Sequence, residues 1–162
     1  MILEYCQLLS TAHRVLDGIL VEGKSDNGRK VTRYELDGLD DELFYKATHI
    51  NHPSAIWVRQ SKQNYVWLHA LLQALCREYT YRYGKIHKCE RDDLVEYLTT
   101  PPKNIPDVPF TEPTPAMPDE VKVLGDSISS YRNYYIKNKT HLASWSGKIN
   151  SRNTPEWFNA AI

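Results

Sequence analysis

The sequence lacks the residue patterns that mark common cofactor and metal enzymes. It contains no Walker loop, no GxGxxG, no HExxH, no GxSxG and no zinc-spaced set of cysteines and histidines. These absences argue against a P-loop kinase, a Rossmann dehydrogenase and a zinc enzyme. His49 and His52 are spaced i, i+3, and His87 precedes Cys89 by two, but neither pair has a clear carboxylate partner. We therefore expect neither a metal nor another cofactor.

Cysteine and long apolar runs are also scarce. The chain has three cysteines, Cys6, Cys76 and Cys89, which form no CxxC pair. This sparse, odd set indicates a reducing compartment without a disulfide framework. No stretch reaches the roughly 18 apolar residues of a membrane span, and the first residues do not resemble a signal peptide. A cytoplasmic protein without a membrane partner is the expectation.

Charge of one sign is not in excess. Twenty basic residues meet twenty acidic ones, so the formal net charge is zero. Proteins that bind along the DNA backbone normally carry a surplus of lysine and arginine, which argues against that class. The 162 residues, 41% apolar and 25% charged, predict a single globular domain over 1–162. Eleven tyrosines and four tryptophans are many for this length and serve either a core or stacking surfaces.

The periodicity of apolar residues predicts a mainly α fold around one long central helix. Seven of the nine prolines fall between 101 and 118, with apolar residues interleaved, which predicts an extended strap across the domain. A turn cluster at 23–28 between two β-leaning runs predicts a small N-terminal hairpin. The expected elements are a helix over 2–16, strands over 19–22 and 31–36, a short helix from Asp40, the long helix over 53–83 (continuous or broken in two), a short helix over 94–98, the strap over 101–118 and a C-terminal helix over 126–145.

Three groups of residues are candidate ligand-binding residues. The first is His52, Arg59 and Asn64 on the long helix, where Asn64 would read a base edge and Arg59 would contact a phosphate. The alternative is that Asn64, a buried amide that must find partners, ties down the strap while His52 caps the helix.

The second group is the basic turn over 82–88, with Arg82, Lys85 and His87. It would form an anion pocket, or its cations would only complement the helix dipole. The third group is the tyrosines, among them Tyr131 and Tyr134. Tyr131 and Tyr135 are spaced i, i+4 and are expected to face the core, but tyrosine hydroxyls that meet the basic turn would bind sugar or phosphate.

Several segments together resemble one family over nearly the whole chain. They are 9–14 (LSTAHR), 51–59 (NHPSAIWVR), 64–68 (NYVWL), 76–87 (CREYTYRYGKIH), 115–120 (PAMPDE) and 131–135 (YRNYY). They are similar to small phage proteins that are often labelled as similar to pyrimidine-dimer DNA glycosylases of the endonuclease V type. The resemblance implies a phage protein in the cytoplasm of an infected host cell. A glycosylase of that type uses an N-terminal threonine amine as nucleophile, whereas this chain begins Met1-Ile2-Leu3-Glu4. Relatives also carry a preceding segment with histidines and lysines that are missing here, so catalysis through a Schiff base is not expected.

The favoured function is therefore a phage nucleotide- or nucleobase-binding protein, a sponge that sequesters a host nucleotide signal without turnover, in counter-defence. A small phosphorylated ligand suits a local basic patch better than a long duplex does. The alternatives are a pyrimidine-dimer DNA glycosylase with lyase activity, which would make DNA the partner, and a non-catalytic interaction protein. Exposed aromatics would also fit a homo-oligomer.

Overall fold

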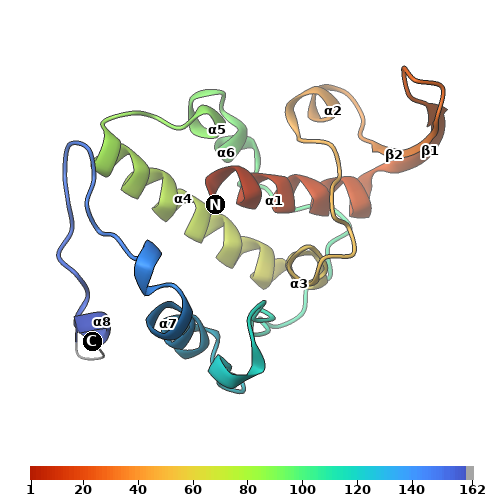
Figure 1. Ribbon diagram of the computed structural model, residues 1–162. Coiled ribbons are helices and arrows are strands. Elements are labelled where there is room, and N and C mark those ends of the chain that lie inside the picture. Colours follow the sequence, from red (N-terminus) through yellow and green to blue (C-terminus); the bar gives the residue numbers. More distant parts are fainter. Residues whose placement is uncertain (160–162) are drawn as a thin grey trace. The chain divides into compact units, whose positions relative to one another are not determined.

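The structure, a computed structural model, describes residues 1–159, and over them the predicted mainly α fold with a small N-terminal hairpin is confirmed (Figure 1). Two compact units make up the chain. The first unit comprises residues 1–77 and 86–111, and the second comprises 78–85 and the described residues from 112 onward. The elements are α1 (Ile2–Asp17), β1 (Ile19–Lys24), β2 (Lys30–Glu35), α2 (Leu39–Leu43), α3 (Pro53–Gln60), α4 (Lys62–Tyr83), α5 (Lys88–Arg91), α6 (Leu94–Tyr97), the 3-10 helix η1 (Asp119–Val121), α7 (Ser127–Asn138), the 3-10 helix η2 (Thr140–Leu142) and α8 (Glu156–Asn159).

The hairpin extends from the C-terminal end of α1 in the first unit (Figure 1). β1 and β2 pair antiparallel from Ile19 opposite Glu35 to Lys24 opposite Lys30. Gly28 takes a positive φ of 74° in the turn, a conformation that glycine adopts without steric cost. Most residues of both strands are exposed on both faces of the ribbon. The hairpin therefore gains its support at its base rather than along its length.

The long helix expected over 53–83 is two helices, because the chain is extended at Ser61. The Ser61 hydroxyl donates to the Val108 carbonyl at 2.6 Å and accepts from the Gln63 amide at 3.1 Å. The Lys62 amide donates to the carbonyl of Pro106 at 2.8 Å. These bonds to the proline-rich segment replace the helical bonds that a continuous helix would make at this point.

Arg14 organises the centre of the first unit. Its side chain is fully buried on α1, and all five of its hydrogen-bond donors are used. Nε donates to the Tyr45 carbonyl at 2.7 Å, and Nη1 donates to the Tyr34 carbonyl at 2.8 Å and to the Asp41 carboxylate. Nη2 donates to the carbonyls of Asp41 and Phe44 at 2.9 and 2.8 Å. Arg14 thus connects three segments to α1: the base of the hairpin, α2, and the residues directly after α2.

The proline-rich segment forms neither helix nor strand over 101–116, apart from a turn at 103–104, and the part of it in the first unit is fixed by polar contacts. The Asp17 carboxylate at the end of α1 accepts from the amides of Lys103 and Asn104 at 2.7 and 2.9 Å. Further along, the Gln63 side chain accepts from the Phe110 amide at 3.0 Å. The segment is thus held by backbone amides that donate to polar side chains on α1 and α4, and no strand pairs with it among the described residues.

In the second unit, α7 is shorter than the helix expected over 126–145. Asp126 caps it as predicted, accepting from the Ser129 amide at 2.9 Å. The prediction that Tyr131 and Tyr135 face the core is wrong, since they are 43% and 44% exposed. The small residues Ser127 and Ser130 form the buried face instead, which lets the helix pack closely against the backbone that precedes it.

The last described helix, α8, brings two aromatic residues into the second unit. Phe158 is buried against Trp145, with ring centroids 4.8 Å apart. Arg132 of α7 lies over the ring of Trp157 at 5.4 Å. Within residues 1–159, none of the helices combines the length and the apolar character needed to cross a bilayer.

Candidate functional site

The eight predicted ligand-binding residues are divided equally between the two units. His52, Arg59, Asn64 and His87 belong to the first unit; Arg82, Lys85, Tyr131 and Tyr134 belong to the second. Their side chains differ in how far they are already engaged by bonds within the chain. That difference decides which of them can meet a ligand.

His52 and His87 both cap helices. His52 Nδ1 accepts from the Ser54 amide at 3.2 Å at the start of α3, which confirms the predicted cap. His87 Nδ1 accepts from the Cys89 amide at 3.2 Å at the start of α5. Each imidazole satisfies an amide that has no partner inside its helix.

Arg59 and Asn64 bind backbone inside the first unit. Arg59 Nη1 donates to the carbonyls of Ile50 and Ala55 at 2.7 and 2.9 Å, and its burial lowers the pKa of the guanidinium. Asn64 is fully buried and donates through Nδ2 to the Trp57 carbonyl at 2.9 Å and to the Thr111 hydroxyl at 3.0 Å.

Asn64 Oδ1 also accepts from the Thr111 amide at 2.9 Å, so the expectation that Asn64 ties down the strap is confirmed. Both of its amide hydrogens are used in these bonds. A base edge at Asn64 would have to displace one of them.

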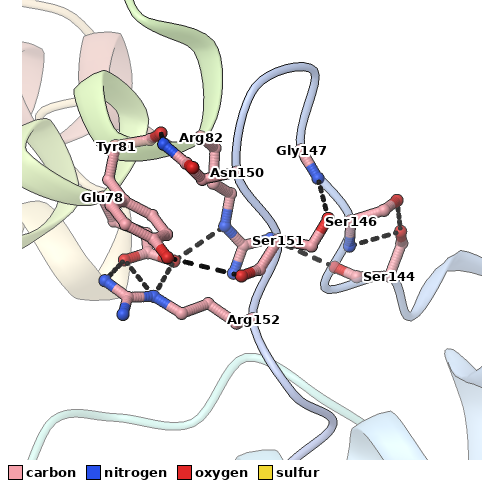
Figure 2. Close-up of polar contacts among 9 residues, drawn as sticks. All are labelled: Glu78, Tyr81, Arg82, Ser144, Ser146, Gly147, Asn150, Ser151 and Arg152. Atoms are coloured by element: carbon pink, nitrogen blue, oxygen red, sulfur yellow. Dashed lines mark hydrogen bonds and ion pairs between the residues drawn. The ribbon is translucent and has the colours of Figure 1, made fainter.

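In the second unit, cations surround the C-terminal end of α4. The loop over 144–152 packs against this helix end and satisfies its last carbonyls (Figure 2). The Ile149 amide donates to the Arg82 carbonyl at 2.8 Å, and Asn150 Nδ2 donates to the Tyr81 carbonyl at 2.9 Å. Gly147 has no room for a side chain, since a Cβ there would lie 2.1 Å from the Asn150 carbonyl oxygen.

Glu78 provides a carboxylate at this helix end, and two arginines bind it (Figure 2). Arg82 Nε donates to Oε1 at 2.7 Å, and Arg152 donates to Oε2 through Nη2 at 3.0 Å. Hydrogen bonds from Arg152 and from Arg82 lower the pKa of Glu78. The carboxylate therefore remains ionised and positions both guanidinium groups, which together with it carry one surplus positive charge.

Two lysines add to this charge. A Cβ at Gly84 would lie 2.3 Å from Ile149 Cδ1, so the chain around Ile149 contacts the helix end at Gly84. Lys85 directly follows Gly84 in the sequence, and Lys148 directly precedes Ile149. Both lysines are exposed, and neither ammonium group has a hydrogen-bond or ion-pair partner among the described residues. We call Arg82, Lys85, Lys148 and Arg152 the basic cluster; with Glu78 it has a net charge of about +3.

Aromatic rings accompany the basic cluster. Arg152 lies over the ring of Tyr81, 3.8 Å from its centroid, and Tyr83 contacts Tyr79 with centroids 5.1 Å apart. The residues Tyr81 and Tyr83 remain 39% and 40% exposed. Exposed tyrosines beside cations are the combination that binds a base and its phosphate.

The α7 tyrosines take no part in the contacts between α4 and the loop. Tyr131 is exposed on α7, and the Tyr134 ring lies 5.3 Å from the ammonium group of Lys139. Among residues 1–159, no three histidine, cysteine, aspartate or glutamate side chains are placed together as metal ligands would be.

Sequence reasoning missed Lys148 and Arg152 because they lie far along the chain from α4. One signal was available: the stretch over 127–155 contains five lysines and arginines and no acid, in a chain whose total charge is zero.

Comparison with known proteins gives no match for this chain, whether among protein-family models, curated proteins or solved structures.

Proposed function

We propose that the protein binds a small phosphorylated nucleotide at the basic cluster and releases it unchanged. The observation that carries this proposal is the arginine pair that one carboxylate fixes at the end of α4. Two exposed lysines, Lys85 and Lys148, are the sequence neighbours of Gly84 and Ile149, which meet at the same helix end. Lysine ammonium groups and arginine guanidinium groups are the side chains that proteins use for phosphate.

The geometry suits a small ligand better than a long one. The cations cluster at one helix end, and the surplus there is local because the rest of the chain offsets it. Tyr81, one ring face of which Arg152 already covers, and Tyr83 are both partly exposed. A base that stacks on either ring would gain about 1–3 kcal/mol. In the phage setting that the sequence resemblance implies, such a protein would sequester a host nucleotide signal by stoichiometric binding.

The test is calorimetric titration with a panel of mononucleotides, dinucleotides and cyclic dinucleotides, on the full chain and on the double variant Lys85→Gln/Lys148→Gln. Each lost charge-assisted contact costs about 1.5 kcal/mol, so the double variant should bind the best ligand roughly 100-fold more weakly. The matched control is Lys62→Gln/Lys103→Gln, which removes the same charge from exposed lysines of the first unit. The control should bind like the unsubstituted protein.

The fate of the ligand separates binding from catalysis. Mass spectrometry of ligand recovered after denaturation should return the intact nucleotide in a molar ratio near that of the protein. Equal affinity of the double variant and its control would overturn the basic cluster as the site. A chemically altered ligand, or a borohydride-trapped adduct with damaged duplex DNA, would instead support the glycosylase alternative.

A further inference from the structure

The outward face of α7 carries an apolar stripe that the described residues of the second unit leave exposed. Ile128, Tyr131 and Tyr135 are spaced i, i+3 and i+7, so they share one face of the helix. Ile128 is 60% exposed, and the two tyrosines are more than two-fifths exposed. Leu124 precedes the helix and Leu142 follows it, and both are exposed.

Charge along this segment changes sign from one end to the other. Asp119, Glu120 and Asp126 lie before the helix, and Lys122, the only cation in the sequence from 119 to 126, pairs with Asp119 at 2.7 Å, which leaves a net charge of about −2 there. Arg132, Lys137 and Lys139 lie within and directly after α7, in a stretch of sequence without an acid. The helix dipole has the opposite polarity, with its positive end beside the acids and its negative end beside the cations.

We infer that the stripe is a self-association surface on which α7 pairs antiparallel with α7 of a second copy of this chain. In that arrangement the acidic end of each helix lies against the basic end of the other, and the two dipoles are antiparallel. A parallel pair would instead place cations against cations. Ile128 of each copy faces Tyr135 of the other, and Tyr131 lies near the two-fold axis, as a self-complementary interface requires.

A second copy fits this surface better than a partner of one charge does. A uniformly acidic partner would oppose Asp126 and Glu120, and a uniformly basic partner would oppose Arg132 and Lys139. The chain itself has both charges in the order that antiparallel pairing needs. This inference is independent of any nucleotide at the basic cluster.

Sedimentation equilibrium of the full chain tests the association. The unsubstituted protein should shift toward twice the monomer mass as its concentration rises to about 100 μM, the range in which a weak dimer forms. Tyr131→Glu should abolish the shift because it introduces two like charges at the axis. Tyr97→Glu is the matched control, since Tyr97 is similarly exposed, at 44%, but lies in the first unit. Ile128→Ser is a second interface variant, and circular dichroism checks the folding of each.

Crosslinking tests the direction of the pair. The three native cysteines are buried, so single cysteines introduced on α7 dominate the reaction with a short bismaleimide. Tyr131→Cys should crosslink quickly, whereas two copies of Ile128→Cys would be offset by about 10 Å along the axis and should crosslink slowly. A monomer at every concentration, a dimer that survives both Tyr131→Glu and Ile128→Ser, or faster crosslinking at position 128 would overturn the inference.

Discussion

A fully buried arginine whose five donors all meet acceptors is costly to replace, even by lysine. We expect Arg14→Lys to lower the free energy of unfolding by about 3 kcal/mol, because lysine has three donors and leaves buried carbonyls unpaired. Urea denaturation followed by circular dichroism measures the change. Arg77→Lys, at an exposed position on α4, is the control and should stay within about 0.5 kcal/mol of the parent. Equal stability of the two variants would contradict the role given to Arg14.

His13 makes stability depend on pH. Burial lowers its pKa from 6.5 to about 4, and the nearby charges of Asp17 and Asp40 oppose this shift only in part. The Tyr65 hydroxyl donates to the Leu98 carbonyl at 2.8 Å and lies 2.9 Å from His13 Nε2.

The unfolded chain takes up a proton on His13 below pH 6.5, while the folded chain stays neutral there until about pH 4. The contribution of His13 is therefore complete above pH 6.5 and is lost as the pH falls to about 4, a decrease of up to about 3 kcal/mol. Denaturant titrations at several pH values measure it. The slope should flatten in His13→Gln and should not change in His141→Gln, an exposed histidine; the same slope in both variants would assign the pH dependence to other groups.

For single residues, the sequence predicted those structural roles that depend on neighbours along the chain. His52 beside Pro53 indicated a helix cap, and Asn64 on an apolar stripe indicated a buried amide that needs partners; both are confirmed. Arg14 was not anticipated as a buried residue. Its acceptors come from residues 34–45, and no spacing in the sequence relates them to α1.

The contact between α4 and the loop over 144–152 depends on a missing side chain. A Cβ at Gly147 would meet backbone and side-chain atoms of Asn150 and Arg82 at 2.1 to 2.9 Å. We expect Gly147→Ala to cost about 2 kcal/mol, the range of overpacking, and to weaken nucleotide binding by displacing Lys148 and Arg152. Thermal unfolding and the calorimetric titration measure the two effects. Gly23→Ala is the control, because a Cβ there meets nothing within 4 Å; similar results for both glycines would mean that the loop is not held closely against the helix.

The elements themselves were largely predictable, and their ends were not. Apolar periodicity located α1 and the helical stretch over 53–83, and the turn cluster at 23–28 located the hairpin. The break at Ser61 depends on carbonyls of the proline-rich segment, which is remote from it in the sequence. Similarly, α7 ends near Asn138 rather than at 145, and its exposed tyrosines follow from the serines that pack on its other side.

For the molecule as a whole, apolar periodicity predicted the fold class, but neither it nor composition indicated the division into two compact units. The residues of α4 run from one unit into the other without proline or glycine, so no boundary is visible there in the sequence. The total charge is equally uninformative about the two units, because a sum of zero conceals the acid-free stretch over 127–155 in the second unit. The basic cluster could be found only once the fold had brought that stretch to the end of α4.

The positions of the three cysteines allow opening of the first unit to be measured through the reactivity of their thiols. All three thiols are buried in the first unit, and burial raises the pKa of Cys76 to about 11. A thiol reagent can therefore react only when that unit opens, and the rate of modification measures how often it does so. The second unit contributes no thiol but has Trp145 and Trp157. A kinetic experiment with a thiol-reactive dye therefore measures opening of the first unit alone, because the second unit has no thiol with which the dye reacts.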